Sequence, residues 1–177
     1  MGTTLKFLSE NTVRKCTFGK PRYLDSGNPR LDALIETVAD VDGQFTVWAQ
    51  FREELRAIAA ALAAAKITYA EYHGGISTKD RETAVDAFQS GKARAFVGHP
   101  AAAGVGLTLT AAQTAIYFSN GFSLEQRIQS EDRCHRKGTR TNIVYIDLVA
   151  ENTIDESIAS ALVKKINMAS AIIGDLK

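Results

Sequence analysis

The chain has 177 residues, of which 45% are hydrophobic and 23% charged, a composition typical of one folded domain and not of a disordered chain. Its 21 basic and 20 acidic residues leave a net charge of +1, so any nucleic-acid surface has to be a local patch. Its two cysteines, Cys16 and Cys134, exclude a disulfide framework and a four-ligand zinc site. The sequence has no signal peptide and no apolar run of about 20 residues, so we expect an intracellular protein, cytoplasmic or nucleoid-associated, without a membrane partner.

Residues 1–28 are polar and show no apolar periodicity, and we interpret them as a linker or the remnant of an upstream region. One domain is expected to follow over residues 29–177. Its first element is an amphipathic helix, because apolar residues recur at helical spacing from Leu31 to Val38. Pro29 is well suited to begin this helix.

Strands and helices then alternate to the end of the sequence. Runs rich in β-forming residues predict strands over residues 45–51, 67–72, 94–98, 114–118 and 142–149. Helical spacing and capping signals predict helices over residues 55–62, 77–90, 123–137 and 154–173. This alternation indicates βαβ crossovers, and hence a three-layer α/β sandwich with a mainly parallel sheet. Ligands of such sheets bind in the loops that follow the carboxyl ends of the strands.

Several common nucleotide-binding and catalytic motifs are absent from the sequence. It contains no P-loop and no nucleophile elbow, G-x-S-x-G. Gly104-Val-Gly106 is similar to the start of a dinucleotide-binding loop, but position 109 is leucine, and the alternative is a simple tight turn. The three histidines lie in different predicted loops without ligand spacing, so we expect no metal site.

The helix predicted from Ser123 to about Lys137 is unusually polar for a helix that covers a sheet. Gln129, Arg133 and Arg136 recur at i, i+4 and i+7 and form a polar row. Further positive charge nearby comes from Arg127, Lys137 and Arg140. Two interpretations are open at this point: a solvated face whose cations suit the helix C-terminus, or an arginine clamp on a phosphate group.

Four segments, in one order along the chain, resemble the motifs of superfamily-two helicases, and most closely those of the Swi/Snf-type translocases. Residues 96–118, which include Gly104-Val-Gly-Leu-Thr-Leu109, resemble motif V, and Gln129-Ser-Glu-Asp-Arg-Cys-His-Arg-Lys-Gly138 resembles motif VI. Upstream, residues 46–51 are similar to motif IV, and residues 73–81 to the nucleic-acid-contacting motif that follows it.

The resemblance implies the second RecA-like lobe of a two-lobe, ATP-dependent DNA helicase or translocase. In that family ATP and magnesium lie between the lobes, and the first lobe, which this sequence lacks, brings the P-loop and the magnesium-binding acid. Arg136 would be the principal arginine finger, Arg133 a second phosphate contact, and Gln129 a polar partner of the nucleotide. Gly104 and Gly106 would let the backbone approach ATP. We therefore expect the isolated chain not to hydrolyse ATP.

For nucleic acid, the resemblance implies a phosphate track that does not read the bases. Its candidate residues here are Gln50, Gly74, Ser77, Arg81 and His99. These residues also have structural interpretations: Ser77 is equally well explained as a helix cap, Gln50 as a strand-end polar residue and Arg81 as a solvated helix residue. The expected partner is DNA, with RNA as the alternative.

The sequence departs from the family pattern at Ala103, Thr108 and Ser130, where glycine, asparagine and alanine are usual. These departures bear on the details of nucleic-acid contact more than on the fold. The alternative role for Arg133 or Arg136 is a salt bridge to a neighbouring acid such as Glu131 or Asp132.

Two other functions are alternatives to the motor lobe. The first is a non-catalytic module that binds nucleic acid or a partner protein through the basic helix, and it predicts salt-dependent binding by the isolated chain. The second is a self-contained α/β enzyme that holds a nucleotide at Gly104-Val-Gly106. The missing third glycine and the lack of a catalytic set make it the weaker of the two.

Overall fold

The structure, a computed structural model, describes residues 14–16, 28–104, 106–134 and 143–175. Within these ranges the chain forms a six-stranded sheet with the strand order β1-β6-β5-β2-β4-β3, in which every pairing is parallel. The strands are β1 (Arg14–Cys16), β2 (Gln44–Trp48), β3 (Tyr69–Tyr72), β4 (Ala95–Gly98), β5 (Ala112–Tyr117) and β6 (Val144–Ala150). The helices are α2 (Pro29–Ala39), α3 (Arg52–Ala64), α4 (Thr78–Gln89), the 3₁₀ helix η1 (Pro100–Gly104), α5 (Leu124–Cys134) and α6 (Ile154–Asp175).

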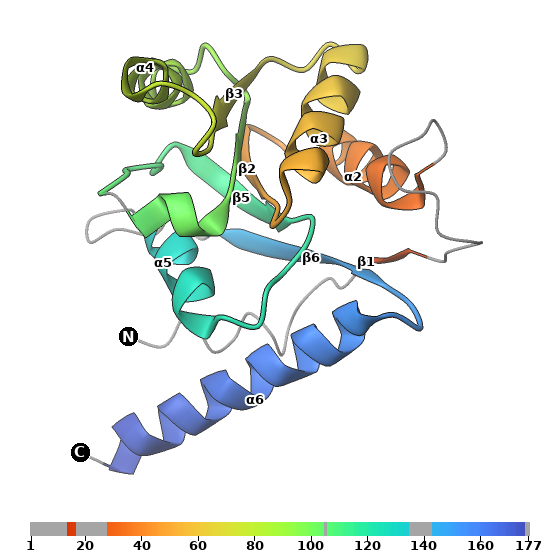
Figure 1. Ribbon diagram of the computed structural model, residues 1–177, viewed down its shortest axis with the longest axis vertical. Coiled ribbons are helices and arrows are strands. Elements are labelled where there is room, and N and C mark those ends of the chain that lie inside the picture. The colour runs from red at the N-terminus through yellow and green to blue at the C-terminus, as the bar shows by residue number, and fades with distance from the viewer. Residues whose placement is uncertain (1–13, 17–27, 105, 135–142, 176–177) are drawn as a thin grey trace.

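Helices cover both faces of the sheet, as the connections between parallel strands require. Helices α2 and α3 pack against each other on one face, and α4 and α5 lie on the other. Helix α6 packs on β6 and α5, and Figure 1 shows its far end extending away from the sheet. The predicted three-layer α/β sandwich is therefore confirmed. No helix in the described ranges is long and apolar enough to cross a membrane.

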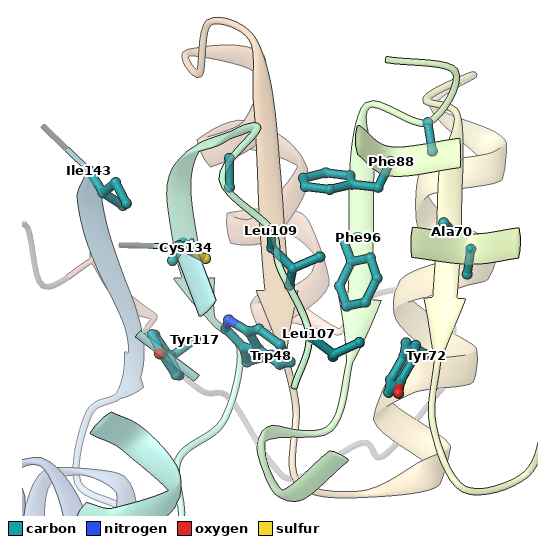
Figure 2. Packing of buried hydrophobic residues seen from close by; sticks show 14 of the residues in the cluster. Trp48, Ala70, Tyr72, Phe88, Phe96, Leu107, Leu109, Tyr117, Cys134 and Ile143 are labelled. Carbon is teal, nitrogen blue, oxygen red and sulfur yellow. The ribbon is translucent and has the colours of Figure 1, made fainter. Parts of the chain in front are cut away.

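The central strand β2 divides the core into two clusters, because successive side chains of a strand point to opposite faces. Phe45 and Val47 belong to the cluster under α2 and α3, whereas Trp48 belongs to the cluster under α4 and α5. In the second cluster the rings of Trp48 and Phe96 lie 6.0 Å apart, edge to face, and those of Phe88 and Phe96 lie 5.5 Å apart (Figure 2). Each fully buried side chain of this size stabilises the fold by about 1.5–3 kcal/mol.

The predicted elements are present, with ends that shift by a few residues, and two features were not predicted. The segment from Pro100 contains the helix η1 rather than only a loop. Strand β1 lies within the polar residues 1–28 and pairs with β6 at the edge of the sheet, Arg14 opposite Leu148. Three residues are too few to show a periodicity in the sequence. The end predicted for the polar helix, residues 135–137, lies outside the described residues.

Candidate functional site

The loops that follow β2, β3, β4 and β5 leave the same edge of the sheet, because all of these strands are parallel. Gln50 follows β2, and its backbone N–H donates to the hydroxyl of Ser119, which follows β5, at 2.9 Å. The Ser119 hydroxyl in turn donates to Glu54 at 2.5 Å. A Cβ on Gly121 would lie 3.2 Å from Gln50 Oε1, so the Gln50 side chain lies directly against this second loop. Two of the loops at the carboxyl edge are thus held together.

The segment between β3 and α4 contains three of the predicted nucleic-acid residues. Ser77 is the N-cap of α4: its hydroxyl accepts from the backbone N–H of Asp80 at 3.1 Å and donates to the Asp80 carboxylate at 2.7 Å. This is the structural interpretation that the sequence allowed for Ser77. Gly74 is exposed, and no atom lies within 4 Å of the position where its Cβ would be. The backbone at Gly74 is therefore accessible to a ligand.

Arg81, predicted as a nucleic-acid contact with a solvated helix residue as the alternative, is half-buried. Its guanidinium carbon lies 5.9 Å from the centre of the Tyr72 ring, and its Nε is buried without a hydrogen-bond partner in the described structure. Arg52, which the sequence reasoning did not single out, places its Nη2 against Gly75, 2.9 Å from where a Cβ would be. Charged residues at the start of a helix are usually surface charge, so no signal distinguished Arg52.

His99 and the two glycines belong to the segment between β4 and β5. The His99 Nδ1 accepts from the backbone N–H of Ala101 at 3.0 Å, and its carbonyl accepts from Ala102 at 2.9 Å, so His99 begins η1. Gly104 is the last residue of η1. Gly106 has a φ of +54°, a conformation that favours glycine. The tight-turn interpretation therefore accounts for Gly106 without a ligand.

Helix α5 packs directly against η1, and the two lie side by side in Figure 1. The backbone N–H of Leu109 donates to the carbonyl of Arg133 at 2.9 Å, which ties the last turn of α5 to the same segment. Gln129 is half-buried, and its side-chain amide donates to Glu125 at 3.0 Å. The structure thus brings Gln129 and Arg133 onto the helix that contacts the predicted motif V segment.

Arg133 is a half-buried arginine without a counter-ion among the described residues. Its Nε is buried and has no hydrogen-bond partner within the described ranges. Buried donors are almost always satisfied in native structures, and one that is not calls for an explanation. A guanidinium in this state fits a phosphate group, whose oxygens match its planar fork. Arg136 lies outside the described residues, as do Lys137 and Arg140.

Arg127 is a correction to the expectation of positive charge on the surface of α5. It is 3% exposed, and its side chain ends in an ionic network. Its Nε donates to Glu131 at 2.5 Å, its Nη1 and Nη2 donate to the carboxylate of Asp147, and Nη1 also donates to Asn120 at 3.0 Å. The guanidinium carbon lies 3.4 Å from the centre of the Tyr117 ring. The positive charge of Arg127 therefore pairs with buried acids and does not lie on the surface.

The same network explains why α5 lacks a wide apolar stripe. Its buried residues are Arg127, Ser130, Glu131 and Cys134, and each of the polar ones has a partner. Ser130 donates to the Arg127 carbonyl at 2.8 Å and bonds to the Tyr117 hydroxyl at 2.7 Å. Burial raises the pKa of Glu131, an effect that the neighbouring Arg127 opposes. The inner face of α5 carries polar side chains that bond to one another and to the sheet, and it is not solvated.

A sequence signal for this network did exist. Asp147 stands alone in a strand whose other residues are apolar or aromatic, and it is 2% exposed. A carboxylate at such a position requires a buried cation. The sequence gives no means of choosing which arginine supplies it. No three His, Cys, Asp or Glu side chains gather into a possible metal site anywhere in the described ranges.

Comparison with known families and sequences finds relatives for most of this chain. The model of the helicase conserved C-terminal domain matches residues 29–138. The SWI/SNF-related matrix-associated actin-dependent regulator of chromatin subfamily A containing DEAD/H box 1 homolog of Drosophila melanogaster is 30% identical over 163 residues, 92% of this chain and 18% of its own. ATP-dependent helicase fft2 of Schizosaccharomyces pombe is 26% identical over 168 residues, 94% of this chain and 13% of its own. This chain therefore spans less than a fifth of either relative.

A solved structure shares the fold. The crystal structure of the C-terminal part of the Fun30 ATPase domain superposes with a TM-score of 0.71 at 23% sequence identity, covering 82% of this chain and 48% of that one.

Proposed function

Because the chain belongs to the family of helicase conserved C-terminal domains, with Swi/Snf-type relatives, we propose that it is the second lobe of an ATP-driven DNA translocase. The first lobe, supplied by the rest of a longer protein, binds ATP and magnesium. This lobe contributes Arg133 and Arg136 to the phosphates and part of the track for the nucleic acid. The share of its relatives that the chain spans supports a partial motor rather than a whole one.

The state of Arg133 is the observation that carries the proposal. Its guanidinium has no counter-ion among the described residues and holds a buried, unsatisfied Nε. The salt-bridge alternative named Glu131 and Asp132. Among the described residues, Glu131 pairs with Arg127, and no ion pair joins Arg133 to either acid. A phosphate of ATP bound by a facing lobe would satisfy the guanidinium.

In the proposed mechanism the two lobes close on ATP, and the arginines meet the negative charge that develops on the transferred phosphoryl group. Such an arginine finger is worth about 10³–10⁵ in rate, because it acts where water is excluded and needs no reorganisation. Arg136 is the principal finger by its place in the motif, three residues after Arg133. Gln129 acts as a polar partner of the nucleotide or of the facing lobe. The backbone at Gly104 and Gly106 approaches the nucleotide.

The nucleic-acid track follows the carboxyl edge of the sheet. Gln50, Gly74, Ser77, Arg81 and His99 lie in the loops that leave this edge or at the start of the helix that follows. Backbone amides and small polar side chains there hold phosphates and do not read bases, so we expect little sequence preference. Arg52, beside Gly75, adds a guanidinium to the same edge.

The test uses the two-lobe protein. We expect Arg133→Ala to lower the rate of DNA-stimulated ATP hydrolysis by about 10²–10³-fold, with DNA affinity changed by less than threefold. The matched control is Arg56→Ala, since Arg56 is exposed and, among the residues that the structure describes, paired only with Glu53, at 3.2 Å. Unchanged hydrolysis in Arg133→Ala would contradict the phosphate role of Arg133, and with it the observation on which the proposed function rests.

A further inference from the structure

We propose that Asn120 and Arg127 are positioning residues that join the nucleic-acid edge of this lobe to helix α5. Through them, nucleic acid bound at the edge sets the placement of Arg133 and so stimulates ATP hydrolysis. The inference rests on the proposed function, since it assumes that both ligands bind. It adds the physical connection between them, which neither the helix nor the loop provides alone.

The connection between bound nucleic acid and α5 begins at the carboxyl edge of the sheet. Gln50, a candidate nucleic-acid contact, lies against Gly121, with its Oε1 3.2 Å from the position of a Gly121 Cβ. The preceding residue, Asn120, is half-buried and turns its amide inward, where Nδ2 donates to Asp147 Oδ1 at 2.7 Å. On the other side, Lys165 of α6 donates to the carbonyl of Phe122 at 2.7 Å. The loop from Asn120 to Phe122 is thus held at both ends and touches Gln50 in the middle.

Arg127 links this loop to the helix and to the sheet at once. One guanidinium donates to Asn120 in the loop, to Asp147 on β6 and to Glu131 in α5. The acids are 2% and 5% exposed, so water does not compete for these bonds. Displacing the loop relative to α5 would break the hydrogen bonds of Asn120 with Arg127 and Asp147 and leave their polar atoms unsatisfied, which is unfavourable. The loop is therefore coupled to α5 through Asn120.

The helix transmits that placement to its last turn. Arg133 follows Arg127 by six residues, a distance of about 9 Å along an α-helix at 1.5 Å per residue. A helix of this length is rigid compared with the loops around it. A shift at Gln50 and Asn120 is therefore carried to the guanidinium of Arg133, which has no counter-ion among the described residues. Its effect on the rate depends on placement to within about 1 Å. In this proposal the unit formed by the loop and α5 takes one arrangement when nucleic acid is bound and another when it is not.

The experiment measures, in the two-lobe protein, ATP turnover with and without saturating duplex DNA. Asn120→Ala removes two hydrogen bonds, one to Asp147 and one from Arg127, while leaving both acids paired with Arg127, so folding is preserved. We expect the ratio of stimulated to basal turnover to fall by about 3- to 30-fold, with basal turnover falling less and with KM for ATP and DNA affinity within about threefold. Gln113→Ala is the control, because Gln113 is an exposed amide near the start of β5, at the end of that strand away from the loop that contains Asn120.

A second variant tests the role of the Arg127 guanidinium. Arg127→Lys keeps the charge, but three donors on a single nitrogen cannot reproduce the four bonds that the guanidinium makes from three nitrogens. We therefore expect an equal or greater loss of stimulation, while Arg56→Lys at an exposed site has none. An unchanged ratio in Asn120→Ala, or equal losses of basal and stimulated turnover, overturns the inference. Arg133→Ala in the same assay separates the two claims. If it leaves hydrolysis intact, the proposed function itself fails, whatever Asn120→Ala does.

Discussion

Arg127 and Glu131, four residues apart on α5, form a buried ion pair in which Arg127 Nε donates to the Glu131 carboxylate at 2.5 Å, whereas Arg133 on the same helix has no counter-ion among the described residues. The two arginines lie on a helix with few apolar residues, yet their surroundings are opposite. Arg127 is enclosed by acids and an aromatic ring. No acid in the described part of the chain pairs with the guanidinium of Arg133, which leaves it available to an anion.

The pH dependence of stability should report on Glu131. Its pKa in the folded chain is raised by burial, with Arg127 opposing the shift, so folding favours the protonated form. This group therefore stabilises the fold below its unfolded pKa, and that contribution is lost as the pH rises through the folded pKa. Because glutamine does not titrate, the difference in the free energy of unfolding, Glu131→Gln minus parent, should be more positive at pH 8 than at pH 5, measured by urea denaturation. A difference that is more positive at pH 5 would contradict this.

Removal of one partner from the buried network should lower the free energy of unfolding much more than removal of a surface acid. Asp147→Ala leaves Arg127 buried with only one of its two acids, and broken buried ion pairs cost about 3–5 kcal/mol. The matched control is Asp86→Ala on the exposed side of α4, for which we expect a change within about 0.5 kcal/mol. Urea denaturation of both variants measures the difference. Similar values for the two would mean that the network adds little to stability.

Arg94 holds the connection between α2 and β2. Its Nη2 donates to the carbonyls of Val41 at 2.6 Å and Val38 at 3.2 Å, and its Nε donates to Gly43 at 3.2 Å. Since bonds to a charged group contribute about 1.5–3 kcal/mol, we expect Arg94→Ala to lower the free energy of unfolding by about 2 kcal/mol. Lys92→Ala, at an exposed position two residues earlier, serves as the control. A loss no larger than that of the control would contradict the assignment.

Cys134 should be chemically inert in the folded chain. Burial raises the pKa of its thiol to about 12, although the Thr46 hydroxyl lies 3.9 Å from its sulfur. Because the thiolate is the reactive form, a Cys16→Ser chain should not react with a thiol reagent at pH 8 until it is denatured. Stoichiometric labelling without denaturant would show that the site is open to solvent.

Most of the fold was predictable, because it depends on periodicities that the sequence displays over long segments. The alternation of strands and helices is enough to predict the layers and the parallel sheet. Strand β1 was not predictable, since three residues carry no period and the pairing with β6 depends on distant residues. The same limit applies to η1, whose start depends on the local bond from Ala101 to His99.

The candidate site was predictable in part. The spacing of Gln129 and Arg133 is visible in the sequence, and the structure places both on the helix that packs against η1. Arg127 was interpreted as surface charge because a sequence does not show which arginine of a helix faces inward. The roles of Asn120 and Arg127 depend on Asp147, which lies on a separate strand. Such a contact between distant segments becomes visible only in the folded chain.

The central claim, that Arg133 acts on the phosphates of ATP held by a facing lobe, is tested most directly by single-turnover hydrolysis in the two-lobe protein. ATP affinity is measured in the same samples, so that loss of binding is separated from loss of the chemical step. The account predicts that Arg133→Ala slows the chemical step by about 10²–10³-fold, while Arg56→Ala leaves it unchanged. A chemical step of unaltered rate in Arg133→Ala would contradict the account.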